Sequence, residues 1–485
     1  MTSIDLLVGE IGSTTTKVNA FALGGGGAAG PVGPAFVGQG RAPTSVAQGD
    51  VVVGLRGAID DLGRQLGGEV RWGRMMASSS AAGGLRMSVH GLVRDMTVKA
   101  AREAALGAGA ILRFVTAGDL TDSDLETVGR VRPNIILLAG GVDYGERATV
   151  VANAHRLAAL GPPAPVVYAG NVAARDEVVG VLQAAGIRVY PVENVYPRLD
   201  EMVIEPTRRA IQRVFEEHIV RAPGMDRVRE LVDGPIIPTP GAVMNMAVLL
   251  RTAIGDLVAV DVGGATTDVH SVTEGSEEIA RMLVAPEPVA KRTVEGDLGV
   301  FVNAPNVIDL IGPAELAKEF GVPEPELVRL ARPLPTTDRE QAFSARLTRE
   351  AVRAGLLRHA GRLRYLYGPT GRTVVSEGKD LTAVKWLIGT GGALTRLPGG
   401  EEALAAMRAR DRGRELLPGL EAAVALDRDY IMASCGVLSA EHAKEAVALM
   451  QKSLGVPGPF AAHPAPPGPS PTKEADEFAS PDPAD

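Results

Sequence analysis

Two short segments of this sequence share one layout, and this internal repeat limits the folds that the chain can adopt. Residues 10–17 read Glu-Ile-Gly-Ser-Thr-Thr-Thr-Lys, and residues 261–268 read Asp-Val-Gly-Gly-Ala-Thr-Thr-Asp. Each segment follows a short apolar run typical of a buried strand, begins with a carboxylate, and has glycine two positions later. Each then runs through small hydroxyl residues into another strand. The repeat therefore predicts two homologous halves whose turns face each other.

The residue types in these turns fit a site that holds phosphate groups. Glycine lets the backbone turn sharply and approach a ligand. Successive backbone N–H groups and Ser or Thr hydroxyls can then donate to phosphate oxygens. The residues that we assign to this role are Gly12, Ser13, Thr14, Thr15, Gly263, Gly264, Ala265 and Thr266.

Four charged residues in the two segments are the candidate catalytic groups. The carboxylates of Glu10, Asp261 and Asp268 would repel phosphate directly, so we interpret them as ligands, through water, of a bridging Mg²⁺ ion. Asp261 or Asp268 could also orient an attacking water. Lys17 would stabilise the charge that develops on the terminal phosphoryl group. Two ordinary β-hairpins with glycine turns are the alternative interpretation, and the matched layout argues against it.

A third glycine-rich turn follows a strand predicted at residues 383–388. Such a turn before a helix permits an adenosine or an α-phosphate to lie against the backbone. Alone it is a weak signal, because glycine-rich turns often serve packing only. We assign Gly389, Thr390, Gly391 and Gly392 to nucleotide binding.

Between the two repeats the sequence changes character. Apolar, strand-length runs alternate with helical stretches, which is typical of a doubly wound parallel sheet. We therefore expect residues 104–232 to form an inserted α/β domain with a connecting helix. Its strand ends near Gly140, Gly141 and Asp143 could bind a ligand, or the domain could serve only as a docking platform. The predicted strands are at 111–116, 134–139, 166–169 and 188–192.

Length, charge and cysteine content exclude several classes of protein. The 485 residues suggest about three domains. A formal net charge of −8 argues against nucleic-acid or anionic-membrane partners. The lone Cys435 excludes an intrachain disulfide framework and a multi-cysteine metal cage. No apolar run reaches the ~18 residues of a membrane span, and the N-terminus lacks signal-peptide features. We therefore expect a cytoplasmic protein.

The two phosphate-type turns, the later glycine turn and a final small-residue helix resemble the actin, sugar-kinase and heat-shock-chaperone ATPases. The resemblance implies a two-lobed, actin-like (ribonuclease H-like) α/β core that binds ATP and Mg²⁺ between its lobes. Two connecting helices would be Gly241–Arg251 and Ser434–Val447, with Gly241 and Gly436 allowing close approach.

This resemblance also implies domain boundaries and reveals one departure. The first lobe would comprise residues 1–103, completed by about 429–454, and the second lobe residues 233–428. A tail rich in Pro, Ala and acidic residues, 455–485, is predicted to be disordered. Glu10 stands where the superfamily usually has Asp. The extra methylene moves the carboxylate by about 1.5 Å, so hydrolysis could be slow.

The chain is more closely similar to the MutL/GlmL accessory proteins of glutamate (methylaspartate) mutase. The similar stretches are residues 11–18, 78–92, 135–144 and 261–272, and the likeness covers roughly residues 4–450. It implies an ATP-driven reactivating chaperone that exchanges damaged cofactor in an adenosylcobalamin-dependent mutase or aminomutase. The sequence does not name the client enzyme and is compatible with a homodimer. The alternatives are a small-molecule kinase of the same fold and a non-hydrolysing mutase adaptor.

Overall fold

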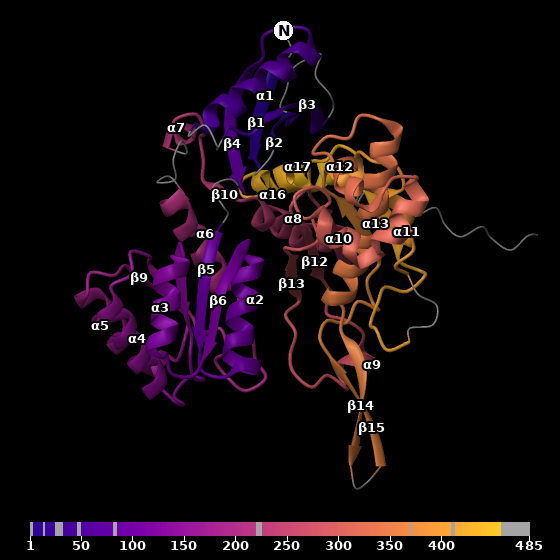
Figure 1. The fold of residues 1–485 in the computed structure, drawn as a ribbon. Coiled ribbons are helices and arrows are strands. Elements are labelled where there is room, and N and C mark those ends of the chain that lie inside the picture. The colour runs from indigo at the N-terminus through magenta and orange to yellow at the C-terminus, as the bar shows by residue number, and fades with distance from the viewer. Residues whose placement is uncertain are drawn as a thin grey trace, which may run out of the picture.

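The computed structural model describes residues 3–12, 15–24, 33–45, 50–80, 85–219, 226–368, 371–408 and 413–456. Within these ranges the chain forms three five-stranded sheets and one two-stranded sheet. They lie in three bodies: a first lobe at the top of Figure 1, a second lobe at the right, and an inserted unit at the lower left. Two predicted site residues, Ser13 and Thr14, and the tail beyond residue 456 lie outside the described ranges.

The first lobe is built on a mixed sheet with the strand order β10-β4-β1-β2-β3. Its central strand β1 pairs antiparallel with β2 and parallel with β4. Helix α1 lies close against the sheet: a Cβ added to Gly40 would be 2.0 Å from the Ala58 carbonyl oxygen. The elements are β1 (Ser3–Ile11), β2 (Thr15–Ala22), β3 (Ala35–Pro43), α1 (Val51–Leu66), β4 (Arg71–Ser79) and β10 (Ile236–Pro238).

The second lobe repeats this sheet. Its order is β13-β12-β11-β16-β17, so β11 again pairs antiparallel with one neighbour and parallel with the other. Residues 257–260 are buried and apolar at every position, as expected for a central strand covered on both faces. The strands are β11 (Leu257–Val262), β12 (Thr267–Val272), β13 (Ala290–Glu295), β16 (Trp386–Thr390) and β17 (Ala423–Leu426).

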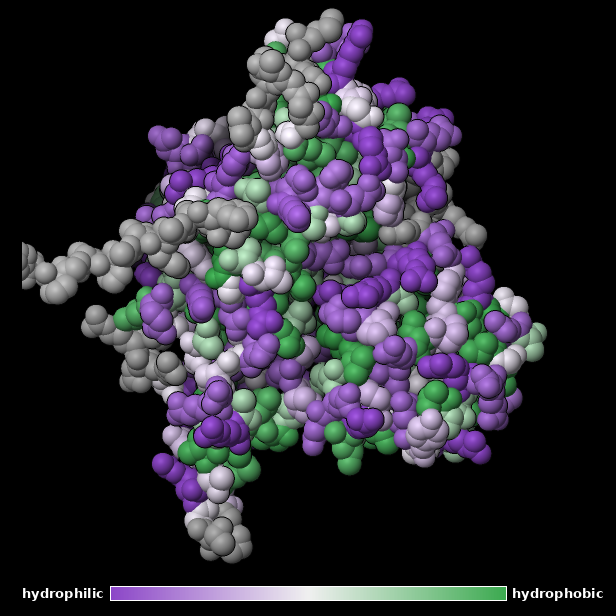
Figure 2. Space-filling model, turned by 180° about the vertical axis from the view of Figure 1, so that it is seen from behind, coloured by the Kyte–Doolittle hydropathy of each residue, from purple (hydrophilic) through white to green (hydrophobic). Residues whose placement is uncertain are grey.

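Helices cover the second sheet, and the longest, α13, starts at a capping box in which Thr337 and Glu340 satisfy each other's backbone N–H groups. A two-stranded hairpin, β14 (Arg362–Gly368) and β15 (Gly371–Glu377), projects from this lobe (Figures 1 and 2). The helical elements are α9 (Glu277–Ala280), α10 (Ala304–Ile311), α11 (Pro313–Phe320), η4 (Glu324–Glu326), α12 (Leu327–Leu330), α13 (Asp338–His359), α14 (Gly392–Thr395) and α15 (Gly400–Ala405).

Two helices in equivalent positions join the lobes: α8 (Thr239–Ile254) follows β10, and α16 (Met432–Leu438) follows β17. They cross so closely that a Cβ on Gly436 would lie 1.8 Å from the Ala242 carbonyl oxygen. The close approach predicted for Gly436 is therefore confirmed, whereas Gly241 instead packs against Ala108. The single helix predicted at 434–447 is wrong: the chain breaks after α16 and continues as α17 (Ala443–Leu454).

The inserted unit is an all-parallel sheet with the order β6-β5-β7-β8-β9. The strands predicted from residue 111 onward are confirmed as β6 to β9. Its elements are β5 (Leu85–Gly91), η2 (Arg94–Val98), α2 (Lys99–Gly107), β6 (Ala110–Ala117), α3 (Asp122–Val131), β7 (Ile135–Leu138), α4 (Ala148–Leu160), β8 (Val166–Tyr168), η3 (Val172–Ala174), α5 (Arg175–Ala184), β9 (Val189–Pro191) and α6 (Glu205–Ile219). The short helix α7 (Asp226–Arg229) follows and lies beside the first lobe, where Arg227 pairs with Asp50 (Figure 1).

Strand β5 shifts the start of this unit from the expected residue 104 to Leu85. The expected boundary falls inside α2, and β5 is an interior strand of the inserted sheet. Two buried polar residues, Ser88 and His90, obscure β5 in the sequence. They are satisfied inside the sheet, where His90 bonds to Ser88 at 3.0 Å and to Thr116 at 2.8 Å.

The helices of the described ranges include none that combines the length and the apolar character needed to cross a membrane.

Candidate functional site

The two repeated segments form hairpin turns of one design. In the first, the Gly12 N–H donates to the Thr15 carbonyl at 3.1 Å; in the second, the Gly263 N–H donates to the Thr266 carbonyl at 2.9 Å. The registers also correspond, because Glu10 is opposite Lys17 and Asp261 is opposite Asp268. Glycine is required in the first turn, where a Cβ on Gly12 would be 2.5 Å from the Thr15 carbonyl oxygen.

Glu10 is buried and fully engaged by donors of the chain. Its Oε2 pairs with Lys17 Nζ at 2.8 Å. Its Oε1 accepts from Asn19 Nδ2 at 3.0 Å and from Ser434 Oγ at 2.6 Å. The longer glutamate side chain thus ties β1 to β2 and to α16. A metal ion could reach this carboxylate only through water or after one of these bonds is released.

Lys17 is held as a cation on the other side of this pair. Burial is the largest effect and opposes its charge, but the negative charge of Glu10, together with Tyr430, the hydrogen bond to Glu10 and Asp427, raises the pKa of Lys17 above its ordinary value. The ammonium also lies over the ring of Tyr430, 3.2 Å from the centroid. Tyr430 has a left-handed backbone conformation, with φ of 55°. Sequence reasoning missed Asn19, Tyr430 and Ser434, because nothing in their local sequence marks them.

Asp261, at the position equivalent to Glu10, is in the opposite situation. No described donor hydrogen-bonds to its carboxylate, and the residue as a whole is half-buried. Burial raises the pKa of Asp261 to about 7, and the charges of Asp268 and Glu10 act in the same direction, against the opposing effect of Lys17. The Tyr430 ring lies over Lys17 and near Gly392, and the adjacent Gly391 contacts Asp261, so the two hairpins lie near each other. The carboxylate is available to a ligand cation.

Asp268, opposite Asp261, is paired with a residue that the sequence did not single out. Arg292 of β13 donates from Nη2 to Asp268 Oδ1 at 2.9 Å. Burial raises the pKa of Asp268, although the Arg292 guanidinium opposes that shift. Asp268 therefore belongs to a buried ion pair behind the turn, rather than standing as an open carboxylate like Asp261.

The third glycine turn lies against the second hairpin. Gly391 has φ of 86°, and a Cβ there would lie 2.3 Å from Asp261 Oδ1. A Cβ on Gly392 would be 3.9 Å from the Tyr430 ring, so this turn approaches the second hairpin and the aromatic ring that lies over Lys17. Thr390 Oγ1 donates to Asp427 Oδ2 at 3.0 Å, and Asp427 also accepts the Met432 N–H at the start of α16. Gly389 serves packing, against Leu394, Leu404 and Leu426.

The second turn is supported from behind by residues 300–303. The Gly264 carbonyl accepts the N–H groups of Phe301 and Val302 at 2.9 and 2.7 Å. The Ala265 carbonyl accepts from Asn303 Nδ2 at 2.7 Å. These bonds occupy the carbonyl oxygens of the turn, which would otherwise repel an anionic ligand.

The described ranges contain no group of three or more His, Cys, Asp and Glu side chains arranged to hold a metal ion. The trio Glu10, Asp261 and Asp268 is therefore not a ready cage of direct ligands. The raised pKa of Asp261 nevertheless fits a cation, because carboxylates close together are relieved by positive charge. A metal here would take most of its ligands from water and from a bound phosphate.

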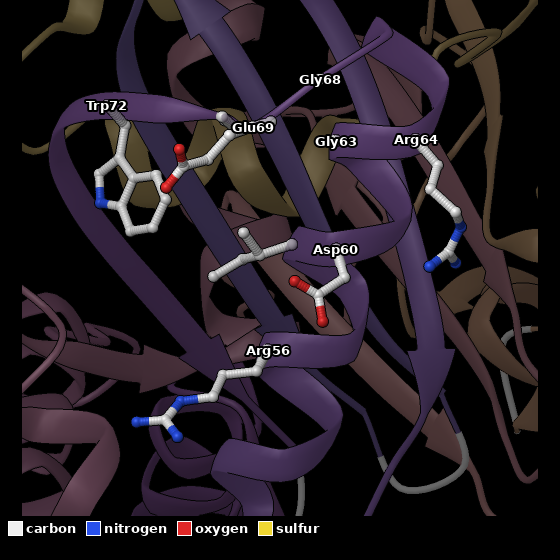
Figure 3. A pocket seen from close by; sticks show the side chains of 9 residues that line it. Arg56, Asp60, Gly63, Arg64, Gly68, Glu69 and Trp72 are labelled. Atoms are coloured by element: carbon white, nitrogen blue, oxygen red, sulfur yellow. The ribbon is translucent and has the colours of Figure 1, made fainter.

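A surface pocket of about 810 Å³ lies elsewhere, between α1 and the start of β4 (Figure 3). In Figure 3, Arg56, Asp60 and Arg64 extend from α1, while Glu69 and Trp72 lie across from them. None of its residues was predicted to be functional, and their charges are mixed. The lining residues are Arg56, Ile59, Asp60, Gly63, Arg64, Gly68, Glu69, Val70 and Trp72.

Comparison with known proteins identifies relatives over nearly the whole chain. The family model described as MutL protein matches residues 6–454. Protein MutL of Clostridium tetanomorphum is 35% identical over 461 residues, covering 92% of this chain and 98% of that protein.

Solved structures give weaker likenesses. A PilM–PilN type IV pilus biogenesis complex covers 93% of this chain and 99% of its own at 13% identity, with a TM-score of 0.23. A signal receiver domain of a modulated diguanylate cyclase from Desulfovibrio desulfuricans G20 covers 28% of this chain and 96% of its own at 15% identity, with a TM-score of 0.20. At such TM-scores neither supports an argument about this chain.

The fold and the site define a mixed α/β protein with two equivalent sheets, matched glycine turns and a parallel-sheet insertion. Within that class, the chain belongs to the MutL protein family. The resemblance drawn from residues 11–18, 78–92, 135–144 and 261–272 is thereby confirmed.

Proposed function

We propose that this chain is an actin-like ATPase that binds ATP and Mg²⁺ between its two lobes. We further propose that it couples hydrolysis to the reactivation of an adenosylcobalamin-dependent mutase, by exchanging damaged cofactor. The observation that carries the nucleotide site is the contrast at equivalent positions of the two hairpins. One hairpin presents a protonated lysine, and the other an open carboxylate with a raised pKa.

The residues of this site suit a metal-bound triphosphate. Backbone N–H groups and hydroxyls of the two turns would hold phosphate oxygens, from Gly12, Ser13, Thr14 and Thr15 on one side and Gly263 to Thr266 on the other. Asp261 would hold Mg²⁺, directly or through water, with Glu10 and Asp268 further back. Gly389, Thr390, Gly391 and Gly392 would lie against the adenosine. The ion would neutralise phosphate charge during transfer, while Lys17 adds a fixed cation.

The mutase part of the proposal rests on family membership. The chain belongs to the MutL family. The resemblance of its sequence to the glutamate mutase accessory proteins implies a cobalamin enzyme as the client. The architecture suits a protein that opens and closes, because the helices α8 and α16 cross in close contact between the two lobes. The inserted unit is connected to the first lobe through the chain and contacts the second lobe at β13. Nucleotide-driven closure would then move the insertion relative to the client.

The test is Mg²⁺-dependent ATP binding and phosphate release by the purified chain, with and without glutamate mutase carrying inactivated cobalamin. We expect turnover that the mutase stimulates, and we expect Lys17→Ala to lower it by about a hundredfold or more. Lys318→Ala, an exposed lysine on α11, is the matched control and should leave turnover unchanged.

The outcomes separate the alternatives. Turnover that does not depend on Lys17, even with mutase present, contradicts the ATPase. Transfer of phosphate to an added small molecule, rather than to water, would identify a kinase. Mutase binding and reactivation without any turnover would identify an adaptor that does not hydrolyse ATP.

A further inference from the structure

Arg292 is the side chain through which the candidate site contacts the inserted unit. It is 2% exposed and is the largest of the fully buried side chains. Its Nη2 donates to Asp268 at 2.9 Å, as described above. Its Nη1 donates to two backbone carbonyls of the inserted unit, those of Leu106 at 3.0 Å and Ala110 at 3.3 Å. One guanidinium thus joins a carboxylate of the second hairpin to another body of the molecule.

The two carbonyls flank the turn between α2 and β6: Leu106 lies in the last turn of α2, and Ala110 is the first residue of β6. The last carbonyls of a helix lack partners within the helix and carry partial negative charge. A guanidinium at the end of α2 therefore stabilises it in two ways: it donates hydrogen bonds to these carbonyls, and its positive charge attracts their partial negative charge. In Figure 1, α2 is the element of the inserted unit that faces β13.

This turn cannot shift independently of the lobe-joining helix α8. A Cβ on Gly109, which has φ of 96°, would lie 2.9 Å from the Gly241 backbone nitrogen. A Cβ on Gly241 would lie 2.8 Å from the Ala108 carbonyl oxygen. The backbones are thus in direct contact, and a displacement of the turn must be accompanied by a displacement of α8 or by separation of the two.

A second connection holds the other end of α2. Lys99 Nζ lies 2.5 Å from Glu287 Oε1 and 3.1 Å from the Pro286 carbonyl, and Lys291 pairs with the same glutamate at 2.8 Å. This connection joins the inserted unit to the second lobe without involving Asp261 or Asp268. The Lys99–Glu287 pair therefore serves as a control for Arg292 within the interface between the inserted unit and the second lobe.

We propose that Arg292 is a positioning residue that makes the orientation of the inserted unit depend on what occupies the site at Asp261 and Asp268. This inference rests on the proposed nucleotide site. A cation bound beside Asp261 competes with Arg292 for the negative charge of Asp268 and weakens the Asp268–Arg292 pair. The guanidinium then stays bonded to the α2–β6 turn but is no longer fixed to Asp268 of the second lobe. The inserted unit therefore gains freedom to reorient relative to that lobe. Empty and occupied sites therefore favour different orientations.

The experiment measures that orientation by energy transfer between two labelled cysteines. Tyr144 on the inserted unit is 84% exposed, and Tyr367 on the β14–β15 hairpin is 79% exposed. Tyr144→Cys with Tyr367→Cys supplies both attachment points, because the native Cys435 is buried. Transfer efficiency is recorded while Mg²⁺ and a non-hydrolysable ATP analogue are added, and the same titration gives the nucleotide Kd.

We expect the labelled parent to change its transfer efficiency on binding. In Arg292→Lys, which keeps the charge but not the three-bond geometry, the change should fall at least about threefold, while Kd changes less than that. Lys99→Gln should retain the full response. If Arg292→Lys does not fold, Asp268→Asn cuts the same connection from the other end and should blunt the response in the same way.

Four results would overturn the proposal. A full response in Arg292→Lys, or a parent that binds nucleotide without any response, removes the role of Arg292 and leaves the nucleotide site standing. A response lost equally in Lys99→Gln assigns the effect to the interface in general. A parent that binds no nucleotide refutes both this inference and the proposed function, and the Kd measurement identifies that case.

Discussion

The two central hairpins of this molecule share a backbone and differ in charge. At equivalent register positions, Glu10 faces Lys17 in the first hairpin, and Asp261 faces Asp268 in the second. The first pair is a neutralised ion pair whose acid accepts from three donors. The second consists of two acids, one of which has no described donor. The first hairpin is thus complete without a ligand, whereas the second is built to receive positive charge.

The residues behind the hairpins continue the contrast. Asn19 in β2 bonds to Glu10 and accepts from Gln39 at 2.8 Å. At the equivalent register, β12 has His270 opposite Arg292, and neither ring nitrogen of His270 has a hydrogen-bond partner among the described residues. Burial, together with Arg292, lowers the pKa of His270 well below its ordinary value, so the ring is neutral. Hydrogen bonding is more complete in the first lobe.

The largest expected effect comes from breaking the neutralised pair. Lys17→Met would leave the Glu10 carboxylate buried without its cation, which should lower the free energy of unfolding by about 3–5 kcal/mol. Adding Glu10→Gln removes the uncompensated charge and should recover most of the loss. Urea denaturation of both variants checks this. If Lys17→Met alone is as stable as the parent, the Glu10–Lys17 pair does not stabilise the first hairpin.

The next effect concerns the crossing of the equivalent helices α8 and α16. Gly436→Ala places a methyl group against the Ala242 carbonyl and should cost about 1–3 kcal/mol of stability. Gly129→Ala on α3, where a Cβ has nothing within 4 Å, is the control and should be neutral or slightly stabilising. Equal losses in both variants would argue against the close crossing.

The open carboxylate predicts a pH dependence of metal binding. Because the pKa of Asp261 is raised to about 7, the group is largely protonated below that pH, and a cation must displace the proton. Mg²⁺ affinity in the presence of ATP should fall about fivefold from pH 7 to pH 6 and level off above about pH 8. Titration calorimetry measures the Mg²⁺ affinity at each pH. The same measurement on Asp261→Asn gives the pH dependence that arises from protonation of ATP. Identical profiles for both proteins would refute a role for Asp261.

The smallest effect is a difference in sign between the two equivalent acids. The pKa of Asp261 in the folded chain exceeds its unfolded value, so its charge opposes folding increasingly from about pH 4 and fully above pH 7. Asp261→Asn should therefore raise stability at pH 8, by on the order of 1 kcal/mol, and hardly change it at pH 4. Glu10→Gln should lower stability at pH 8. Thermal unfolding at both pH values tests the comparison, which fails if the two substitutions act alike.

The sequence was informative where the backbone itself imposes a requirement. The turn at Gly12 and the left-handed Gly391 need glycine for steric reasons, so their pattern is visible in one sequence. The repeat predicted two hairpins of one layout, and their registers place Glu10 opposite Lys17 and Asp261 opposite Asp268. Their partners could not be predicted in this way. Ser434 and Tyr430 reach Glu10 and Lys17 from the far end of the chain, and Arg292 looks locally like any basic strand residue.

The hydrogen-bonding state of the three candidate carboxylates was harder to predict than the turns. Composition alone cannot distinguish an acid that is already satisfied, such as Glu10, from one that is open, such as Asp261, because the difference lies in neighbours from other strands. The same limit concealed β5, whose Ser88 and His90 are polar but satisfy each other within the sheet.

The inserted unit occupies the connection from β4 to β10, whereas the described residues of the equivalent connection in the second lobe, from β16 to β17, contain only the helices α14 and α15. Its entry and exit therefore lie on adjacent, paired strands, roughly 4.8 Å apart. Loop closure becomes only slowly more costly as a connection lengthens. A short helical crossover could thus replace the whole unit without unpairing the first sheet. The two lobes and the inserted unit could then be separated by changes at two neighbouring points of the chain.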